Sequence, residues 1–172
     1  GVRTITLASA LPNITGQVFI DGYSQPGSSQ NTLSDACDAV LRIELNGNNA
    51  VTTGFTVAAS DCWIQGLVIN RFTTHSIVVQ SGVTRTNIFG NFIGTNSTGT
   101  AVSGTGNGIR SSGTYTEIGY WGAETRNIIS GATANAGILF TGATCQSNFV
   151  RNNFLGLATN GTTVLGGPAT GH

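Results

Sequence analysis

The sequence predicts an all-β fold in which short parallel strands stack as the coils of a solenoid with about six rungs. Three observations predict it. Gly, Thr, Asn and Ser supply 80 of the 172 residues, a composition that favours strands and turns over long helices. A long internal repeat recurs along the chain, and a shorter ladder of apolar residues followed by Gly or Asn lies within it.

The long repeat is most visible in two pairs of segments. Residues 91–94 (Asn-Phe-Ile-Gly) return at 153–156 as Asn-Phe-Leu-Gly, and residues 99–102 (Gly-Thr-Ala-Val) return at 161–164 as Gly-Thr-Thr-Val. Both pairs have an offset of 62 residues. A repeat of this length, made of short strands and Gly/Asn turns, contains more than one structural unit.

The shorter ladder marks the expected rungs. Its apolar markers are Ile20, Leu45, Ile64, Ile88, Ile118 and Phe149. Stacked coils place equivalent residues about 4.8 Å apart, the usual spacing between neighbouring strands. Because one coil cannot bury its own apolar face, neighbouring coils are expected to share one continuous core.

Strand alternation then assigns faces relative to these markers. Residues two positions before a marker, such as Cys62, Thr86 and Thr116, are expected to point inward. Residues one and three positions before a marker are expected to share the outer face of one sheet. The candidate site residues on that face are five charged residues and two large aromatics: Arg42, Glu44, Asp61, Trp63, Arg85, Tyr115 and Glu117.

This outer face is the candidate binding site. Aromatic rings stack on pyranose rings, while Arg and carboxylate groups hydrogen-bond hydroxyls and uronates, so the face suits a polysaccharide. The alternative is purely structural, because opposite charges on adjacent rungs stabilise cross-strand pairs by about 0.2–1 kcal/mol each.

Composition excludes several classes of protein. The net charge is zero and the seven basic residues are all arginines scattered along the chain, so no basic surface for a nucleic acid is expected. No apolar run is long enough to span a membrane. The 39% apolar content argues against disorder, and the length suits a single domain over residues 1–172.

Three segments carry a family resemblance: residues 20–27 (Ile-Asp-Gly-Tyr-Ser-Gln-Pro-Gly), 66–72 (Gly-Leu-Val-Ile-Asn-Arg-Phe) and 90–99 (Gly-Asn-Phe-Ile-Gly-Thr-Asn-Ser-Thr-Gly). In them the chain resembles right-handed parallel β-helix repeat proteins of the pectin-lyase-like superfamily, of the secreted bacterial type. The resemblance implies a right-handed parallel β-helix and an extracellular or cell-surface location. Because family relatives are longer at both ends, we expect a section of a longer solenoid or a processed subunit.

The resemblance also implies which residues a catalytic site of this fold would require. Lyases of this fold carry an acidic cluster for calcium with an Arg or Lys base, and the hydrolases carry paired Asp and a Gly-His-Gly element. Neither pattern occurs here, and the nearest acidic pair is Glu44 with Asp61 on adjacent rungs. We therefore expect no catalytic residue and no metal or other cofactor. Asp35 and Asp38, in the loop 24–40, are expected to form a solvated cap, with calcium binding as the alternative.

Several Asn residues have a second expected role. Asn70, Asn91, Asn152 and Asn153 lie where strands end and are expected to bond nearby backbone or to stack as internal ladders. Three Asn-x-Ser/Thr sequons mark candidate glycosylation sites at Asn13, Asn96 and Asn160, of which the last two lie in equivalent loops. The three cysteines have no metal-ligand spacing and are expected as free thiols.

Two functions follow from these expectations. The first is a non-catalytic extracellular structural or adhesive module that stacks end to end into a filament, with further copies of itself or flanking solenoid coils as partners. The second is a carbohydrate-active protein, either lyase-like or glycan-binding, that uses the face around Trp63 and Tyr115.

Overall fold

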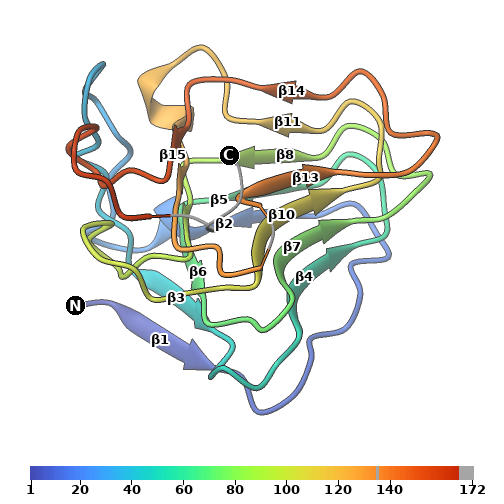
Figure 1. The fold of residues 1–172 in the computed structure, drawn as a ribbon, viewed down its shortest axis with the longest axis horizontal. Coiled ribbons are helices and arrows are strands. Elements are labelled where there is room, and N and C mark those ends of the chain that lie inside the picture. The colour runs from blue at the N-terminus through green and yellow to red at the C-terminus, as the bar shows by residue number, and fades with distance from the viewer. Residues whose placement is uncertain (135, 167–172) are drawn as a thin grey trace.

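The computed structural model describes residues 1–134 and 136–166, and nearly all of its regular structure is β, as predicted. The strands form three parallel sheets (Figure 1). Sheet A contains β1 (Arg3–Thr6), β3 (Ile43–Asn46), β6 (Leu67–Asn70), β9 (Phe92–Ile93), β12 (Ile128–Ile129) and β15 (Phe154–Leu155). Sheet B contains β4 (Thr53–Val57), β7 (His75–Val79), β10 (Asn107–Ser111) and β13 (Ile138–Phe140). Sheet C contains β2 (Phe19–Asp21), β5 (Trp63–Gln65), β8 (Asn87–Phe89), β11 (Glu117–Ile118) and β14 (Phe149–Val150).

The chain visits the three sheets repeatedly in the order A, B, C. Each strand inside a sheet therefore pairs in parallel with the strands one circuit earlier and one circuit later, so that β5 lies between β2 and β8. The first circuit contributes only the bridge of Ile14 with Val57 to sheet B. In Figure 1 the strands of sheet C lie one above another from β2 to β14. Two short 3-10 helices, η1 (Gly22–Ser24) and η2 (Ala123–Thr125), both follow strands of sheet C.

One shared core fills the space between the sheets. Pairing brings like residues into columns, for example Ile64 beside Ile88 and Ile88 beside Ile118 in sheet C. The side chains buried completely or almost completely in this core include Ile64, Ile69, Ile77, Ile88, Ile93, Ile109, Ile118 and Ile129. Burial of each such side chain contributes about 1.5–3 kcal/mol, which is why isoleucine recurs at these positions.

The predicted rung ladder is right at four of its six markers. Ile20, Ile64, Ile88 and Ile118 form one column of sheet C. Leu45 was wrongly placed with them, because it pairs with Ile5 and Ile69 in sheet A. A local apolar–Asn–Gly pattern marks the end of a strand but does not say which sheet the strand belongs to.

The last marker is wrong by one residue. Val150, and not Phe149, pairs with Ile118, while Phe149 pairs with the outward residue Glu117. The slip exchanges the two faces of the strand. Asn148 takes the inward position, where its side chain accepts a hydrogen bond from the N–H of Thr116 at 2.7 Å and donates one to the carbonyl of Gly113 at 3.2 Å.

An asparagine ladder closes the turn between sheets C and A, as expected for Asn91 and Asn153. The sequence did not point to its central member, Asn127. The Oδ1 atom of Asn127 accepts the backbone N–H of Asn91 at 2.9 Å, and its Nδ2 donates to Oδ1 of Asn153 and to the carbonyl of Ile88, both at 2.8 Å. Asn70 and Asn152 lie outside this ladder and bond Glu44 and Arg126, respectively.

The outer face of sheet A is covered by the loop that follows η1. Val68, Phe92 and Ile128 form an apolar column on this face, against which Cys37 and Leu41 of the loop pack. The buried Arg126 holds the loop by donating to three of its carbonyl groups, those of Leu33, Ser34 and Ala36. Cys37, Cys62 and Cys145 are free thiols, as expected.

We expect the Asn127→Ala substitution to lower the free energy of unfolding by about 2 kcal/mol or more, because it leaves the buried N–H of Asn91 without a partner. Chemical denaturation of both proteins measures the change. Asn87→Ala is the matched control: Asn87 is partly exposed on β8, so its truncation should change stability by about 0.5 kcal/mol or less. Equal losses in the two variants would contradict a special role for the ladder.

Candidate binding groove on sheet C

The outer face of sheet C carries the candidate site, and its column starts with two aromatic side chains. Phe19 pairs with Trp63, which in turn pairs with Asn87. The column continues through Glu117 to Phe149. Unlike sheet A, this face exposes large apolar side chains: Phe19 is 58% and Trp63 38% exposed.

A turn of repeated geometry leads into these strands. Asp61, Arg85 and Tyr115 each come two residues before the outward residue of their strand, and all three have positive φ angles, between 54° and 60°. Ser147 repeats this conformation before β14, which agrees with the register in which Phe149 pairs with Glu117. Non-glycine residues adopt this conformation rarely, so its recurrence in four successive circuits shows that the turns stack in register.

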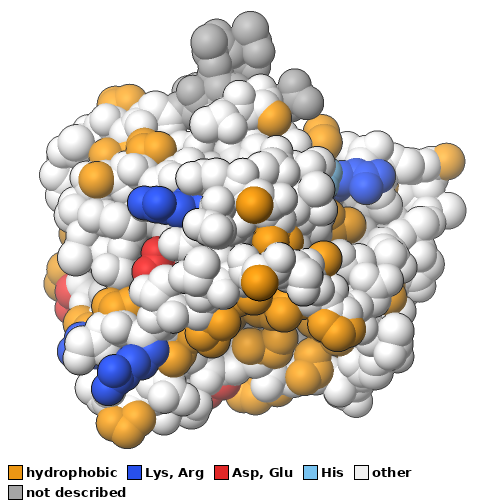
Figure 2. All heavy atoms as spheres, turned by 90° about the horizontal axis from the view of Figure 1, so that it is seen from below, with side chains coloured by type: hydrophobic (Ala, Val, Ile, Leu, Met, Phe, Trp, Pro, Cys, Tyr) orange, Lys and Arg blue, Asp and Glu red, His pale blue; other side chains and the backbone are white. Residues whose placement is uncertain are grey.

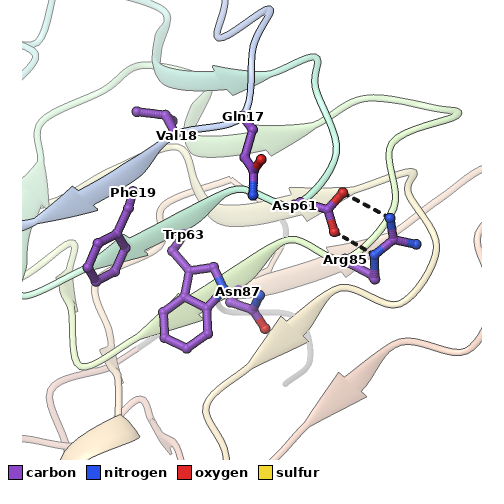
Figure 3. A pocket seen from close by; sticks show the side chains of 7 residues that line it. All are labelled: Gln17, Val18, Phe19, Asp61, Trp63, Arg85 and Asn87. Atoms are coloured by element: carbon purple, nitrogen blue, oxygen red, sulfur yellow. Dashed lines mark hydrogen bonds and ion pairs between the residues drawn. The ribbon is translucent and has the colours of Figure 1, made fainter.

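The first hollow on this face has a volume of about 680 Å³. It is lined by Gln17, Val18, Phe19, Asp61, Trp63, Arg85 and Asn87 (Figure 3). The Phe19 and Trp63 rings meet edge to face, with centroids 5.6 Å apart, and Trp63 meets Phe89 in the same way at 5.2 Å. These contacts hold the indole in place as one wall of the hollow, opposite the Asp61–Arg85 pair in Figure 3.

A second hollow of about 390 Å³ adjoins the first. It is lined by Arg85, Asn87, Tyr115, Glu117 and Phe149. Arg85 and Asn87 line both hollows, so together the two form one depression that runs across the strands from β2 to β14. We call this depression, with its lining residues, the sheet C groove.

An ion pair stands at the centre of the groove. The guanidinium of Arg85 donates to both carboxylate oxygens of Asp61, with Nη2 to Oδ2 at 2.9 Å. The hydrogen bond from Arg85 lowers the pKa of Asp61, and the carboxylate raises the pKa of Arg85 in return. Both side chains are solvent-exposed, so this pair contributes little to stability.

Other polar groups of the groove have no partner within the protein. Among the described residues, no hydrogen bond is formed by the side chains of Gln17, Trp63, Asn87 or Glu117. The indole N–H, the two amides and the carboxylate therefore remain available to hydrogen-bond a polar molecule in the groove.

The structure brings together five of the seven residues predicted for the site: Asp61, Trp63, Arg85, Tyr115 and Glu117. The other two lie elsewhere, because the wrongly placed Leu45 carried them to the wrong sheet. Arg42 donates to the carbonyl of Gly27 at 2.8 Å and anchors the loop over sheet A. Glu44, on β3, accepts hydrogen bonds from Thr4 and Asn70.

Phe149 was missed as a site residue because of the one-residue slip on β14. An aromatic cluster next to the groove was also missed. The rings of Tyr120 and Trp121 extend the row from Phe89, and the guanidinium of Arg151 lies 4.8 Å from the Trp121 centroid and 4.3 Å from that of Phe149. The adjacent Tyr and Trp were the sequence signal for this cluster.

The acidic groups do not form the pairs considered for catalysis. Glu44 lies in sheet A and Asp61 in the turn before β5, so the nearest pair expected from the sequence is not formed. A general acid needs a raised pKa, whereas the pKa of Asp61 is lowered. In the loop over sheet A, Thr32 donates its N–H and hydroxyl to Asp38, both at 2.7 Å, and so lowers the pKa of that carboxyl. No three His, Cys, Asp or Glu side chains converge as a metal site within residues 1–134 and 136–166.

The two equivalent sequon loops have the predicted correspondence. Thr95 bridges to Val102 in one and Leu157 to Val164 in the other, at the same offset. In each, the Asn side chain is engaged in its own turn: Oδ1 of Asn96 accepts the N–H of Thr100, and Oδ1 of Asn160 accepts that of Thr163. The third sequon residue, Asn13, is exposed.

Comparisons with protein-family models, with curated proteins and with solved structures find no match to this chain. Within the part of the chain that the structure describes, none of the helices has the length and apolar character needed to cross a lipid bilayer. The functional argument therefore depends on the geometry of the sheet C groove.

We expect the pKa of the Asp61 carboxyl to lie below the usual value of about 3.9 and to return toward it in Arg85→Gln, because the bond to the guanidinium is lost. Because the folded-state pKa is lowered, the pair favours the folded state above the unfolded-state pKa, and this contribution disappears as the pH falls through the folded-state value. Carboxyl NMR titration measures the Asp61 pKa in the wild type and in Arg85→Gln. The pKa of Asp38 in the same spectra is the internal control and should not move. An unchanged Asp61 pKa in Arg85→Gln would show that the pair does not form in solution.

Proposed function

We propose that this chain is a section of a right-handed parallel β-helix and acts as a non-catalytic adhesive module at the cell surface or outside the cell, binding polysaccharide in the sheet C groove. The fold proposal is supported by the cyclic A, B, C order of the strands and by their parallel pairing one circuit apart. It agrees with the resemblance to the pectin-lyase-like β-helix proteins. The groove itself is the observation that carries the binding function.

The chemistry of the groove fits a sugar better than it fits a small apolar molecule. Trp63 and Phe19 present exposed rings on which the apolar face of a pyranose can stack. Around them stand Asn87, Gln17 and Glu117, whose amides and carboxylate are free to bond hydroxyl groups. The groove is also open and elongated across the strands, so a chain can lie in it without entering a closed pocket.

The carboxyl groups of the groove are arranged for binding a glycan and not for cleaving it. A hydrolase of the inverting or retaining type needs two opposed carboxyl groups, one of which has a raised pKa. In the groove, Asp61 is held as a carboxylate by Arg85, which leaves Glu117 without a matched partner. We therefore propose binding without cleavage, which joins the adhesive module of the first expected function to the glycan-binding form of the second.

Trp63→Ala should weaken binding to the preferred glycan at least tenfold, a loss of about 1.4 kcal/mol, because the stacking wall of the groove is removed. Isothermal titration calorimetry or affinity electrophoresis with xylan, glucomannan, polygalacturonate and alginate measures the loss. Trp121→Ala is the matched control: it removes the same side chain from a site that is 74% exposed and outside the groove. Equal binding by wild type and Trp63→Ala to every glycan would overturn the proposal.

A second candidate function, end-to-end stacking with another copy, is favoured by the match between the two outermost circuits. The inward columns run from Ile5 to Leu155 in sheet A and from Ile20 to Val150 in sheet C, so the same columns would continue into a following copy. Figure 2 views the molecule from the side on which β1 lies and shows apolar side chains gathered in a band on this face. Ile5, at 50%, and Leu155, at 42%, are partly exposed core-type residues on the two outermost strands of sheet A within the described residues.

Sedimentation velocity tests this stacking. Wild-type protein should form species that grow with concentration, while Ile5→Lys and Leu155→Lys should each remain monomeric, because each places a charge in the contact. A mixture of these two variants should form dimers and nothing larger, since each retains one competent end. A wild-type monomer that persists at high concentration would contradict stacking with a second copy.

A further inference from the structure

We propose that the sheet C groove selects uncharged polysaccharides over uronate-containing ones, and that Asp61 sets this selectivity by occupying Arg85. The inference rests on the proposed glycan-binding function and makes it more specific. The sequence alone had left neutral sugars and uronates equally open, because it contained both arginines and carboxylates at the predicted site.

The first argument is the balance of charge. The charged side chains that line the groove are Asp61, Arg85 and Glu117, two carboxylates against one guanidinium. A further cation beside the groove is Arg151, whose guanidinium is stacked on the rings of Phe149 and Trp121. A chain with a carboxylate on each sugar would therefore enter a groove without an excess of positive charge, and like charges placed together oppose binding.

The second argument is that the one arginine facing the groove is already engaged. Both Nε and Nη2 of Arg85 donate to Asp61, so this two-point fork, the Nε–Nη2 edge of the guanidinium, is filled and the charge of Arg85 is already paired. A uronate would have to displace Asp61 to gain the same bonds at that edge. It would gain no net ion pair in doing so, because one carboxylate only replaces another.

The third argument is the kind of partner that the free groups accept. Trp63 offers an indole N–H, while Asn87 and Gln17 offer amides that can both donate and accept. These neutral groups match hydroxyls, which also donate and accept. Together with the exposed faces of Phe19 and Trp63, they provide what an uncharged pyranose needs: an apolar platform edged by neutral hydrogen-bonding groups.

The direction and length of the groove indicate whether the ligand is a single sugar or a chain of sugars. The depression crosses five strands, β2 to β14, and the four spacings between them amount to about 19 Å at the usual strand separation. One strand spacing is comparable to the length of a single pyranose in an extended chain. The geometry therefore favours several consecutive sugars of an extended polysaccharide lying across the strands, rather than a monosaccharide.

The test is the ratio of affinities for an acidic and a neutral glycan, with polygalacturonate and xylan as probes at pH 7 and low salt. Asp61→Asn, which keeps the size of the side chain, frees the Arg85 fork and should raise the ratio of polygalacturonate to xylan affinity at least tenfold. The gain should diminish as salt is added, since it depends on an exposed charge. Adding Arg85→Gln to Asp61→Asn should abolish the gain.

Glu117→Gln is the matched control. It changes the charge of the groove by the same amount but leaves the Asp61–Arg85 pair intact, so the ratio should rise less than threefold. An equal rise in the two variants would show that total charge, and not the occupation of Arg85, sets the selectivity. A wild-type protein that prefers polygalacturonate to xylan would overturn the selectivity while leaving glycan binding intact. Failure to bind any glycan would instead overturn the proposed function itself.

Discussion

The parallel pairing of strands one circuit apart is the constraint on which the other features of this structure depend. When Ile64 pairs with Ile88, the residues on either side are placed in columns as well, so each sheet position repeats its environment from circuit to circuit. Inward columns become the isoleucine core, and the turn before sheet C becomes a column of left-handed residues. The candidate site is another such column, one that points outward and is left uncovered.

Coverage, rather than composition, separates the sheet faces. The outer column of sheet A, which includes Phe92 and Ile128, is as apolar as a core, and it is buried because the loop after η1 packs over it. Arg126 holds that loop through its carbonyl groups, and Asn31 adds a bond from its Nδ2 to the carbonyl of Ala123 at 2.9 Å. Since the described structure places no comparable loop over sheet C, the exposed rings of Phe19 and Trp63 remain on a free surface.

This stacked geometry explains which parts of the fold and of the candidate site could be predicted from the sequence. Apolar periodicity and Gly/Asn turns identify strands, and they placed Ile64, Ile88 and Ile118 in one column correctly. They do not identify the sheet, because strands of sheets A and C can both be followed directly by Gly, as β3 and β5 are, and Leu45 was misplaced for that reason. Just before β14, the partly buried Asn148 looked outward by its chemistry, whereas its hydrogen bonds to the preceding circuit make it an inward residue. Five of the seven candidate site residues were nonetheless predicted together, because their strands belong to the part of the ladder whose register was right.

The chain has few charged side chains, and this scarcity leaves the groove lined mostly by neutral groups. With only fourteen formally charged side chains in the sequence, several are engaged in holding the fold: Arg126 and Arg42 bond loop carbonyls, and Glu44 bonds Thr4 and Asn70. At the groove, the guanidinium of Arg85 is matched by a carboxylate across the neighbouring turn, in a pair too exposed to matter much for stability. The pair adds little to folding and lies beside an exposed tryptophan. We therefore propose that its role is to keep uronates from Arg85. In the proposed glycan-binding role, Asp61 occupies Arg85 and so leaves Trp63, Asn87 and the other neutral groups to determine which molecules bind.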